Sequence, residues 1–277
     1  MLLTLVIASF VLQLAILAGL ARLRLGRRTA LVGAGCGLLA TLAWAVLMDN
    51  NASLYQHLPL KYGFVLCNLT PTLLAVTLGC AAHLARLHAW RMAGYVLLLV
   101  ALQVFYHGAL VYGVPECMQA REGVAILQTT DHTCSAAAAA TLLGLHGIEA
   151  TEGEMAGLCL TTSRGTSIGQ LYHGLRMKCD DRGLAVQVEA LDRAEMERLQ
   201  PPAIVSVKLT AAVDAREPRY RSTWGWLLGV PHAVVLLARN ADGTVTIADP
   251  RIGVEVWPYA ALVDLWDAKV VTLRRRE

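Results

Sequence analysis

Four long stretches without a charged residue constrain the fold of this chain most strongly. They cover residues 1–21, 29–48, 62–85 and 92–115. Each contains about 20 residues or slightly more, which is the length of a helix that crosses a hydrocarbon core of about 30 Å. In succession they leave almost no polar face to meet water, whereas a soluble amphipathic helix presents one. The sequence therefore predicts a four-helix transmembrane domain over residues 1–115, embedded in a lipid bilayer.

The charged residues are unevenly distributed and predict an orientation in the membrane. Residues 1–113 contain seven basic residues and one acidic residue, and the remainder contains 17 basic and 20 acidic residues. Four arginines lie in residues 21–28 and two more in residues 83–91, whereas residues 49–61 contain a single lysine. Because positively charged loops stay in the cytoplasm, both termini and residues 116–277 are expected outside it.

The sequence excludes two classes of function. The charge pattern of neither half has the basic patch of a nucleic-acid-binding protein. No Gly-x-x-x-x-Gly-Lys-Ser/Thr phosphate-binding loop occurs, so the chain is not itself an ATP-driven transporter and we expect no nucleotide partner.

Residues 116–277 have the composition of a separate soluble domain with one core. Its predicted helices come first and its predicted strands follow. This order indicates an α+β fold with an antiparallel sheet. The predicted helices cover residues 135–147, 152–159 and 168–178, and the predicted strands cover residues 185–188, 203–207, 233–237, 244–248 and 270–273.

One cysteine stands where a thiol nucleophile is commonly placed. Cys134 opens an alanine-rich helix, and the unpaired N–H groups and dipole of a helix N-terminus favour a thiolate. Gln128, six residues earlier, carries an amide that can donate to an oxyanion. On its own, a cysteine at a helix start is more often structural.

A thiol nucleophile also needs a base and a group that orients the base. His232 begins one apolar strand and Asp249 ends the next, with Asp-Gly between them at Asp242 and Gly243. Asp-Gly between apolar runs is a strong signal for a β-hairpin, which would bring His232 and Asp249 to the same open end of the sheet. His132 is a rival base, but it is less well placed because it shares a short stretch of chain with Cys134.

Taken in order, these motifs resemble the bacteriocin-processing, double-glycine leader peptidases of the papain-like cysteine peptidase superfamily. The resemblance spans roughly residues 123–273. It implies a papain-like fold, a triad of Cys134, His232 and Asp249, and Gln128 in the oxyanion hole. It also implies a thioester intermediate. The motifs are Gln128, the Cys134 helix ending in Leu-His-Gly147, Arg164-Gly-Thr-Ser167, Pro231-His232 and Ala248-Asp249-Pro250 followed by Ile252-Gly253.

Three features depart from that family. Ser135 follows the nucleophile where family members commonly have glycine. A long connection, residues 208–230, precedes His232, and its tryptophans Trp224 and Trp226 would sit at the lipid interface, clasp a substrate or pack on the core. Finally, well-known members are cytoplasmic, whereas the arginine pattern here predicts that the soluble domain lies outside the cytoplasm. Together with the resemblance to a bacterial family, this orientation implies an integral protein of a bacterial inner membrane with a periplasmic soluble domain.

The other cysteines predict a disulfide and no metal site. Cys117, Cys159 and Cys179 show no Cys-x-x-Cys spacing, and no His-x-x-x-His pair accompanies them, so we expect no metal and no other cofactor. In an oxidising compartment, with Cys134 kept free, two of these three would pair, and we expect Cys159 with Cys179.

Three functions are consistent with this sequence. The first is a membrane-anchored cysteine peptidase that cleaves a peptide or protein near the bilayer surface. The second is a thiol acyltransferase that uses the same triad on a lipid or lipoprotein, which four membrane helices and a Trp-rich loop favour. The third is a non-catalytic peptide-binding module, against which the intact Gln128, Cys134, His232 and Asp249 argue.

Overall fold

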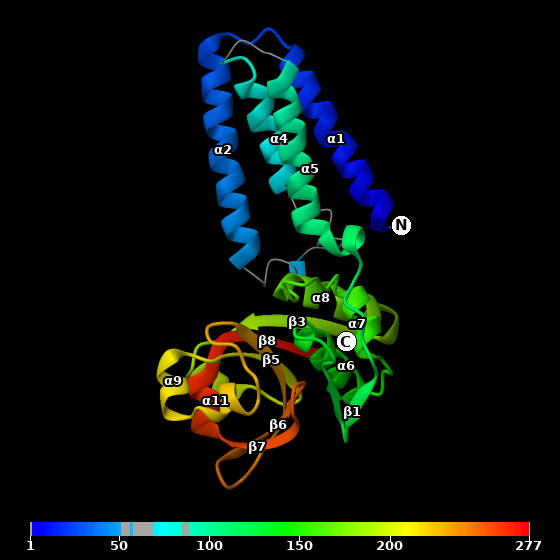
Figure 1. Ribbon diagram of the computed structural model, residues 1–277, viewed down its shortest axis with the longest axis vertical. Coiled ribbons are helices and arrows are strands. Elements are labelled where there is room, and N and C mark those ends of the chain that lie inside the picture. The colour runs from blue at the N-terminus through cyan, green and yellow to red at the C-terminus, as the bar shows by residue number, and fades with distance from the viewer. Residues whose placement is uncertain (1, 51–55, 58–68, 85–88, 277) are drawn as a thin grey trace. The chain divides into compact units, whose positions relative to one another are not determined.

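The computed structural model describes residues 2–50, 56–57, 69–84 and 89–276. The chain divides into two compact units, Met1–Tyr112 and Gly113–Glu277. This division lies three residues before the boundary predicted at Pro115. Figure 1 shows the helices of the first unit in blue to green and the sheet and helices of the second in green to red.

The first unit is built from helices. Three of them contain spans that are long and apolar enough to cross a membrane: Leu3–Arg22, Arg27–Leu47 and Arg91–Leu110. The predicted helix over residues 62–85 begins and ends outside the described residues, and its described part is a shorter apolar helix. The helices are α1 (Leu2–Arg22), α2 (Arg27–Asn50), α4 (Thr70–Ala81) and α5 (Ala89–Tyr112).

For α1, α2 and α5 the predicted helix ends hold to within a few residues, with one correction at the exit from the first unit. The stretch of residues 92–115 was expected to be helical throughout, but α5 ends at Tyr112. Gly113 then adopts a positive φ of 80°, which glycine takes without the steric cost of a Cβ. The helix therefore ends before Pro115 rather than at it.

The helices of the first unit pack through small residues and through polar side chains. A Cβ on Gly37 would lie 2.6 Å from the Thr77 hydroxyl, so α2 and α4 approach closely there. Gln13 on α1 is fully buried and accepts a hydrogen bond of 2.8 Å from Gln103 on α5. Small residues and interhelical hydrogen bonds are the usual contacts between helices in a membrane.

The second unit combines a six-stranded antiparallel sheet with short helices, as the α+β prediction required. The strand order is β3-β8-β4-β5-β6-β7, and a separate β1–β2 hairpin precedes it. The strands are β1 (Ala120–Glu122), β2 (Ala125–Leu127), β3 (Leu184–Ala190), β4 (Ala203–Lys208), β5 (Pro231–Arg239), β6 (Thr244–Asp249), β7 (Gly253–Pro258) and β8 (Trp266–Arg275).

Helices cover both faces of this sheet (Figure 1). Helix α6 packs against β5, and α8 packs against β3. Alternate side chains of the strands, such as Val205, Val234 and Ile247, point to the other face and form the main core with Trp257. The helices are α6 (Cys134–Leu145), α7 (Glu152–Leu158), α8 (Ile168–Cys179), α9 (Ala211–Arg216), α10 (Arg219–Ser222) and α11 (Tyr259–Leu265), with short 3-10 turns at Asp180–Arg182 and Glu195–Arg198.

Every predicted helix and strand of the second unit is present, and the Asp-Gly hairpin is confirmed as the antiparallel pair of β5 and β6. The sequence did not reveal β1, β2, β7, α9, α10 or α11. These elements are short, and several are stabilised by contacts distant in sequence. One example is Trp257 of β7, which is buried against Tyr220 and Trp224 of the 208–230 connection.

Candidate active site

Cys134 is the first residue of helix α6. The helix forms because a run of alanines has high helix propensity and leaves no side chain too large for the packing against β5. The alanines from Ala136 to Ala140 are buried almost completely. Burial of this face fixes the N-terminus of α6, and with it the Cys134 thiol, against the sheet.

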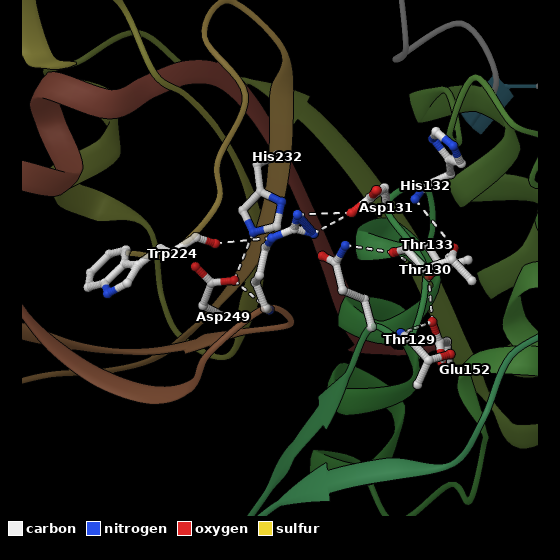
Figure 2. Close-up of polar contacts among 11 residues, drawn as sticks. Thr129, Thr130, Asp131, His132, Thr133, Glu152, Trp224, His232 and Asp249 are labelled. Carbon is white, nitrogen blue, oxygen red and sulfur yellow. Dashed lines mark hydrogen bonds and ion pairs between the residues drawn. The ribbon is translucent and has the colours of Figure 1, made fainter. Parts of the chain in front are cut away.

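The hairpin of β5 and β6 brings His232 and Asp249 together, as expected from the sequence. The Nε2 atom of His232 donates a hydrogen bond of 2.8 Å to Oδ1 of Asp249, which is fully buried (Figure 2). This leaves Nδ1 as the imidazole nitrogen that is available to the Cys134 thiol. A carboxylate bonded in this way fixes both the tautomer and the orientation of an imidazole.

The thiol and the imidazole shift each other's ionisation. Burial opposes ionisation of Cys134, but the hydrogen bond and charge of His232, with the Ala233 backbone N–H and Ser135, hold the pKa of the thiol below its ordinary value of 9.0. Burial would likewise lower the pKa of His232, but the Asp249 carboxylate and the Cys134 thiol raise that pKa to about 10. At neutral pH these directions favour a thiolate beside an imidazolium.

The Asp249 carboxylate is satisfied on both oxygens. Besides the bond from His232, its Oδ2 accepts 3.0 Å from the indole Nε1 of Trp226, and its Oδ1 accepts 2.8 Å from the backbone N–H of Arg251. Each partner lowers the free energy of a buried charge that would otherwise be costly. The indole ring of Trp226 also lies against the imidazole, with ring centroids 4.8 Å apart.

The 208–230 connection therefore belongs to the core and to the site. Trp224 and Trp226 are buried, so of the three alternatives left open by the sequence, packing on the core is the one that the structure shows, and the lipid interface is not. They pack with Tyr220 and Trp257 because large aromatic rings release much surface from water when they stack together. Sequence reasoning missed the contact of Trp226 with Asp249, because only the folded connection brings these two residues together.

Gln128 lies just after β2 and is anchored beside the β6–β7 turn. Its backbone N–H donates 2.7 Å to the carbonyl of Pro250, the residue after Asp249. Its side-chain Nε2 donates 2.8 Å to the carbonyl of Thr130. One hydrogen of that amide is therefore held within the segment between Gln128 and Cys134, and the other is left for a further acceptor.

Arg251 joins the same segment to the sheet. Its guanidinium donates two bonds of 2.9 Å to Oδ1 of Asp131, and its Nε donates 3.0 Å to the carbonyl of Trp224 (Figure 2). The neighbouring His132 has an exposed side chain, and it is not among the groups that shift the pKa of Cys134. The geometry therefore favours His232 over His132 as the partner of the thiol.

The expected disulfide between Cys159 and Cys179 is not formed, and both cysteines are free and buried. The Cys159 sulfur lies against Gly174, so close that a Cβ added to this glycine would clash with the sulfur. Burial raises the pKa of Cys159 to about 12, and burial together with Asp180 raises that of Cys179 to about 11. These thiols act as small apolar groups in the core.

A thiol of lowered pKa, an imidazole and a buried carboxylate at one end of a sheet form the set that nucleophilic catalysis at a carbonyl requires. The structure brings Cys134, His232 and Asp249 into contact in that order. Gln128 is anchored next to the same turn through Pro250.

No protein-family profile and no curated protein matches the chain. Among solved structures, it is similar to the peptidase domain of Streptococcus ComA, a bifunctional ABC transporter, with 16% identity and a TM-score of 0.40 over 55% of this chain and 96% of that one. A double-glycine motif protease of an AMS/PCAT transporter, solved with its leader peptide, has 14% identity and a TM-score of 0.39, over 58% and 91% of the two chains.

A third similar structure is the N-terminal C39-like peptidase domain of a toxin secretion ATP-binding protein from Vibrio parahaemolyticus. It has 12% identity and a TM-score of 0.34, over 53% of this chain and all of that one (100%). The similar structures are thus peptidase domains of the class that the sequence motifs resemble. Because the identities and TM-scores are low, the function proposed below rests on the residues of the site.

Proposed function

We propose that the chain is a membrane-anchored cysteine peptidase that cleaves a peptide or protein substrate through Cys134, His232 and Asp249. The observation that carries this proposal is the fully buried Asp249, bonded at 2.8 Å to a histidine whose other nitrogen is available to a thiol at a helix N-terminus. A structural cysteine needs no such partner. His232 can move a proton to or from the thiol, and Asp249 holds its imidazole in the orientation for that role.

The proposed reaction proceeds in two steps. The Cys134 thiolate attacks the scissile carbonyl carbon, a C–S bond forms, and the carbonyl oxygen takes the negative charge. When this intermediate collapses, the C–N bond breaks and the His232 imidazolium gives its proton to the leaving amine. Water then attacks the thioester, losing its proton to His232, and the thiolate leaves.

Gln128 and the backbone N–H of Cys134 are proposed to stabilise the oxyanion. The second hydrogen of the Gln128 amide is left by the bond to Thr130, and the N–H at the first position of α6 is without an intrahelical acceptor. Donors fixed in advance in this way contribute about 10²- to 10³-fold in rate each. No metal or cofactor takes part in the proposed steps.

An acyltransferase that acts on a lipid or lipoprotein is the second candidate, and one observation favours it. The turn that precedes β5 exposes three large apolar side chains, Leu227, Leu228 and Val230, a few residues before His232. This turn is held by the Gly229 N–H, which donates 2.8 Å to the carbonyl of Leu209. A fixed apolar surface next to the histidine suits a substrate with a hydrocarbon chain.

The membrane arrangement is also a proposal. Three apolar helices of sufficient length, and a shorter fourth, support anchoring of the chain in a bilayer by a four-helix domain. The arginines near residues 22–28 support a cytoplasmic loop there, and hence a periplasmic soluble domain in a bacterial inner membrane.

The peptidase proposal is tested by replacing the nucleophile. The full chain, purified in detergent micelles, would be given a peptide that ends in Gly-Gly-aminomethylcoumarin. Cys134→Ala should abolish coumarin release, because no other group in the site can form the thioester, whereas Cys36→Ala, in the first unit, should keep it. Release by Cys134→Ala at the wild-type rate would rule out Cys134 as the nucleophile of a peptidase.

A further inference from the structure

A buried carboxylate at the start of α7 remains outside the proposed chemistry. Glu152 is 2% exposed, and no basic side chain is paired with it in the described part of the chain. Its oxygens accept hydrogen bonds instead: 2.7 Å from the Thr129 N–H, 2.7 Å from the Thr129 hydroxyl, and a third from the Thr133 hydroxyl. An ionised carboxylate stays buried only when donors of this kind offset its lost hydration.

All three donors come from one short segment, residues 129–133, which joins Gln128 to Cys134 (Figure 2). Thr133 is the N-cap of α6, but its side chain makes no capping bond to the helix. A threonine at this position ordinarily accepts from an N–H of the first turn. Here its hydroxyl is directed to Glu152, so the bond holds the segment and not the helix end.

The bonds continue from Glu152 to Gln128. Within the segment, the Thr130 and Thr133 hydroxyls are 3.0 Å apart and hydrogen bonded. The carbonyl of Thr130 accepts from the Gln128 side chain at 2.8 Å. Glu152 thus fixes the residues that in turn hold the Gln128 amide.

We propose that Glu152 is a positioning residue for the oxyanion site: it holds residues 129–133 so that the Gln128 amide and the Cys134 backbone N–H point to the same place. This inference rests on the proposed function. Glu152 acts through the segment that it binds and does not touch the substrate.

Ionisation of the Cys134 thiol and placement of the oxyanion donors therefore depend on different residues. The groups that shift the pKa of Cys134, apart from its burial, are His232, Ala233 and Ser135, and Glu152 is not among them. Loss of Glu152 should thus impair stabilisation of the oxyanion and leave ionisation of the thiol unchanged.

The experiment compares two reactions of the same sulfur in the full chain. Alkylation of Cys134 by iodoacetamide, followed by the mass of the Cys134 peptide, requires the thiolate but creates no oxyanion. Acylation by the Gly-Gly-aminomethylcoumarin peptide in a single turnover requires both. In Glu152→Gln, an NH₂ group replaces one acceptor and faces the donors of the segment. Alkylation should stay at the wild-type rate while acylation falls about 10- to 100-fold, as misplacement of donors by about 1 Å would cause.

Matched variants separate positioning from folding. Glu154→Gln lies on the same helix, where its ion pair with Lys178 is at the surface, and should leave both rates unchanged. Thr133→Val removes one donor to Glu152 without changing charge and should reproduce the selective loss of acylation. Thr133→Ser, which restores the hydroxyl, should recover most of that loss. This pair keeps the test valid if Glu152→Gln does not fold.

Failure of the positioning role of Glu152 and failure of the proposed function would give different results. Equal acylation rates in wild type and Glu152→Gln, or a parallel fall of alkylation and acylation, would overturn the positioning role. If wild-type Cys134 is alkylated but never acylated, the proposed function fails, and the role of Glu152 in it fails for that separate reason.

Discussion

The two units of this protein place their apolar and polar side chains in opposite ways. In the first unit, large apolar side chains such as Leu12, Leu39 and Leu97 are exposed, while Gln13 and Gln103 are buried and bonded to each other. In the second unit, large apolar side chains are buried on both faces of the sheet, in the core around Trp257 and under α6 and α8. This difference is what the proposed surroundings, a bilayer for the first unit and water for the second, require of the side chains that face outward.

Buried polar side chains also have different roles in the two units. In the first, the Gln13–Gln103 bond joins helices α1 and α5. In the second, buried Asp249 and Glu152 are bonded to the residues around one thiol. If this comparison is right, polar substitutions in the first unit change helix association, and those in the second change chemistry.

Among variants that keep both Cys134 and His232, the largest expected effect in the second unit is that of Asp249→Asn. The shape is kept, but the charge that raises the pKa of His232 to about 10 is lost. We expect substrate cleavage at neutral pH to fall about 10²- to 10⁴-fold. The helix interactions of the first unit should be unaffected.

Loss of the Asp249 charge should also change the pH range over which the thiolate–imidazolium pair exists. In the wild type, the thiolate–imidazolium pair forms above the lowered pKa of Cys134 and is lost as the pH rises through the pKa of His232, about 10. Acylation needs the imidazolium proton for the leaving amine, so acylation measured across this range should fall at lower pH in Asp249→Asn than in the wild type. An unchanged profile in the variant would contradict the assigned role of Asp249.

The smallest effect is expected from Gln13→Leu, which tests the other side of the comparison. Removing the acceptor of the Gln103 amide should weaken helix packing by about 0.5 to 2 kcal/mol. Unfolding by SDS in mixed micelles measures this change. Leu12→Val, at an exposed position next to it, is the control and should change less. A changed rate of Cys134 alkylation in Gln13→Leu would show that a polar side chain of the first unit affects the chemistry of the second. That result would contradict the comparison.

Much of this fold follows from the sequence, because it is encoded in local patterns. Uncharged runs of membrane length indicated α1, α2 and α5, and apolar runs indicated β3 to β6 and β8. The Asp-Gly turn was enough to predict that His232 and Asp249 lie at the same open end of the sheet, but not the register shift between Leu236 and Ala238 that lies between the turn and these residues. The nucleophile, the base and the orienting carboxylate could therefore be proposed from the sequence.

The groups that support the site could not be predicted in this way. Trp226 reaches Asp249, Arg251 reaches Asp131, and Glu152 reaches Thr129 only through folding of the chain. In the sequence, Glu152 is an ordinary acidic residue in the first turn of a helix, which the helix dipole already explains. Nothing local distinguishes such a residue from one that holds a reactive segment.

The most direct test of the central claim is to trap the acyl group on the enzyme. The full chain would be mixed with the Gly-Gly-aminomethylcoumarin peptide, quenched in acid within the first turnover, and digested for mass spectrometry. We predict a peptidyl thioester on Cys134 in the wild type, and no such adduct in His232→Gln, which lacks the imidazolium that protonates the leaving amine. A fatty acyl group on Cys134 in protein taken from its native membrane would support the acyltransferase instead. An adduct on another cysteine, or none, would contradict Cys134 as the nucleophile.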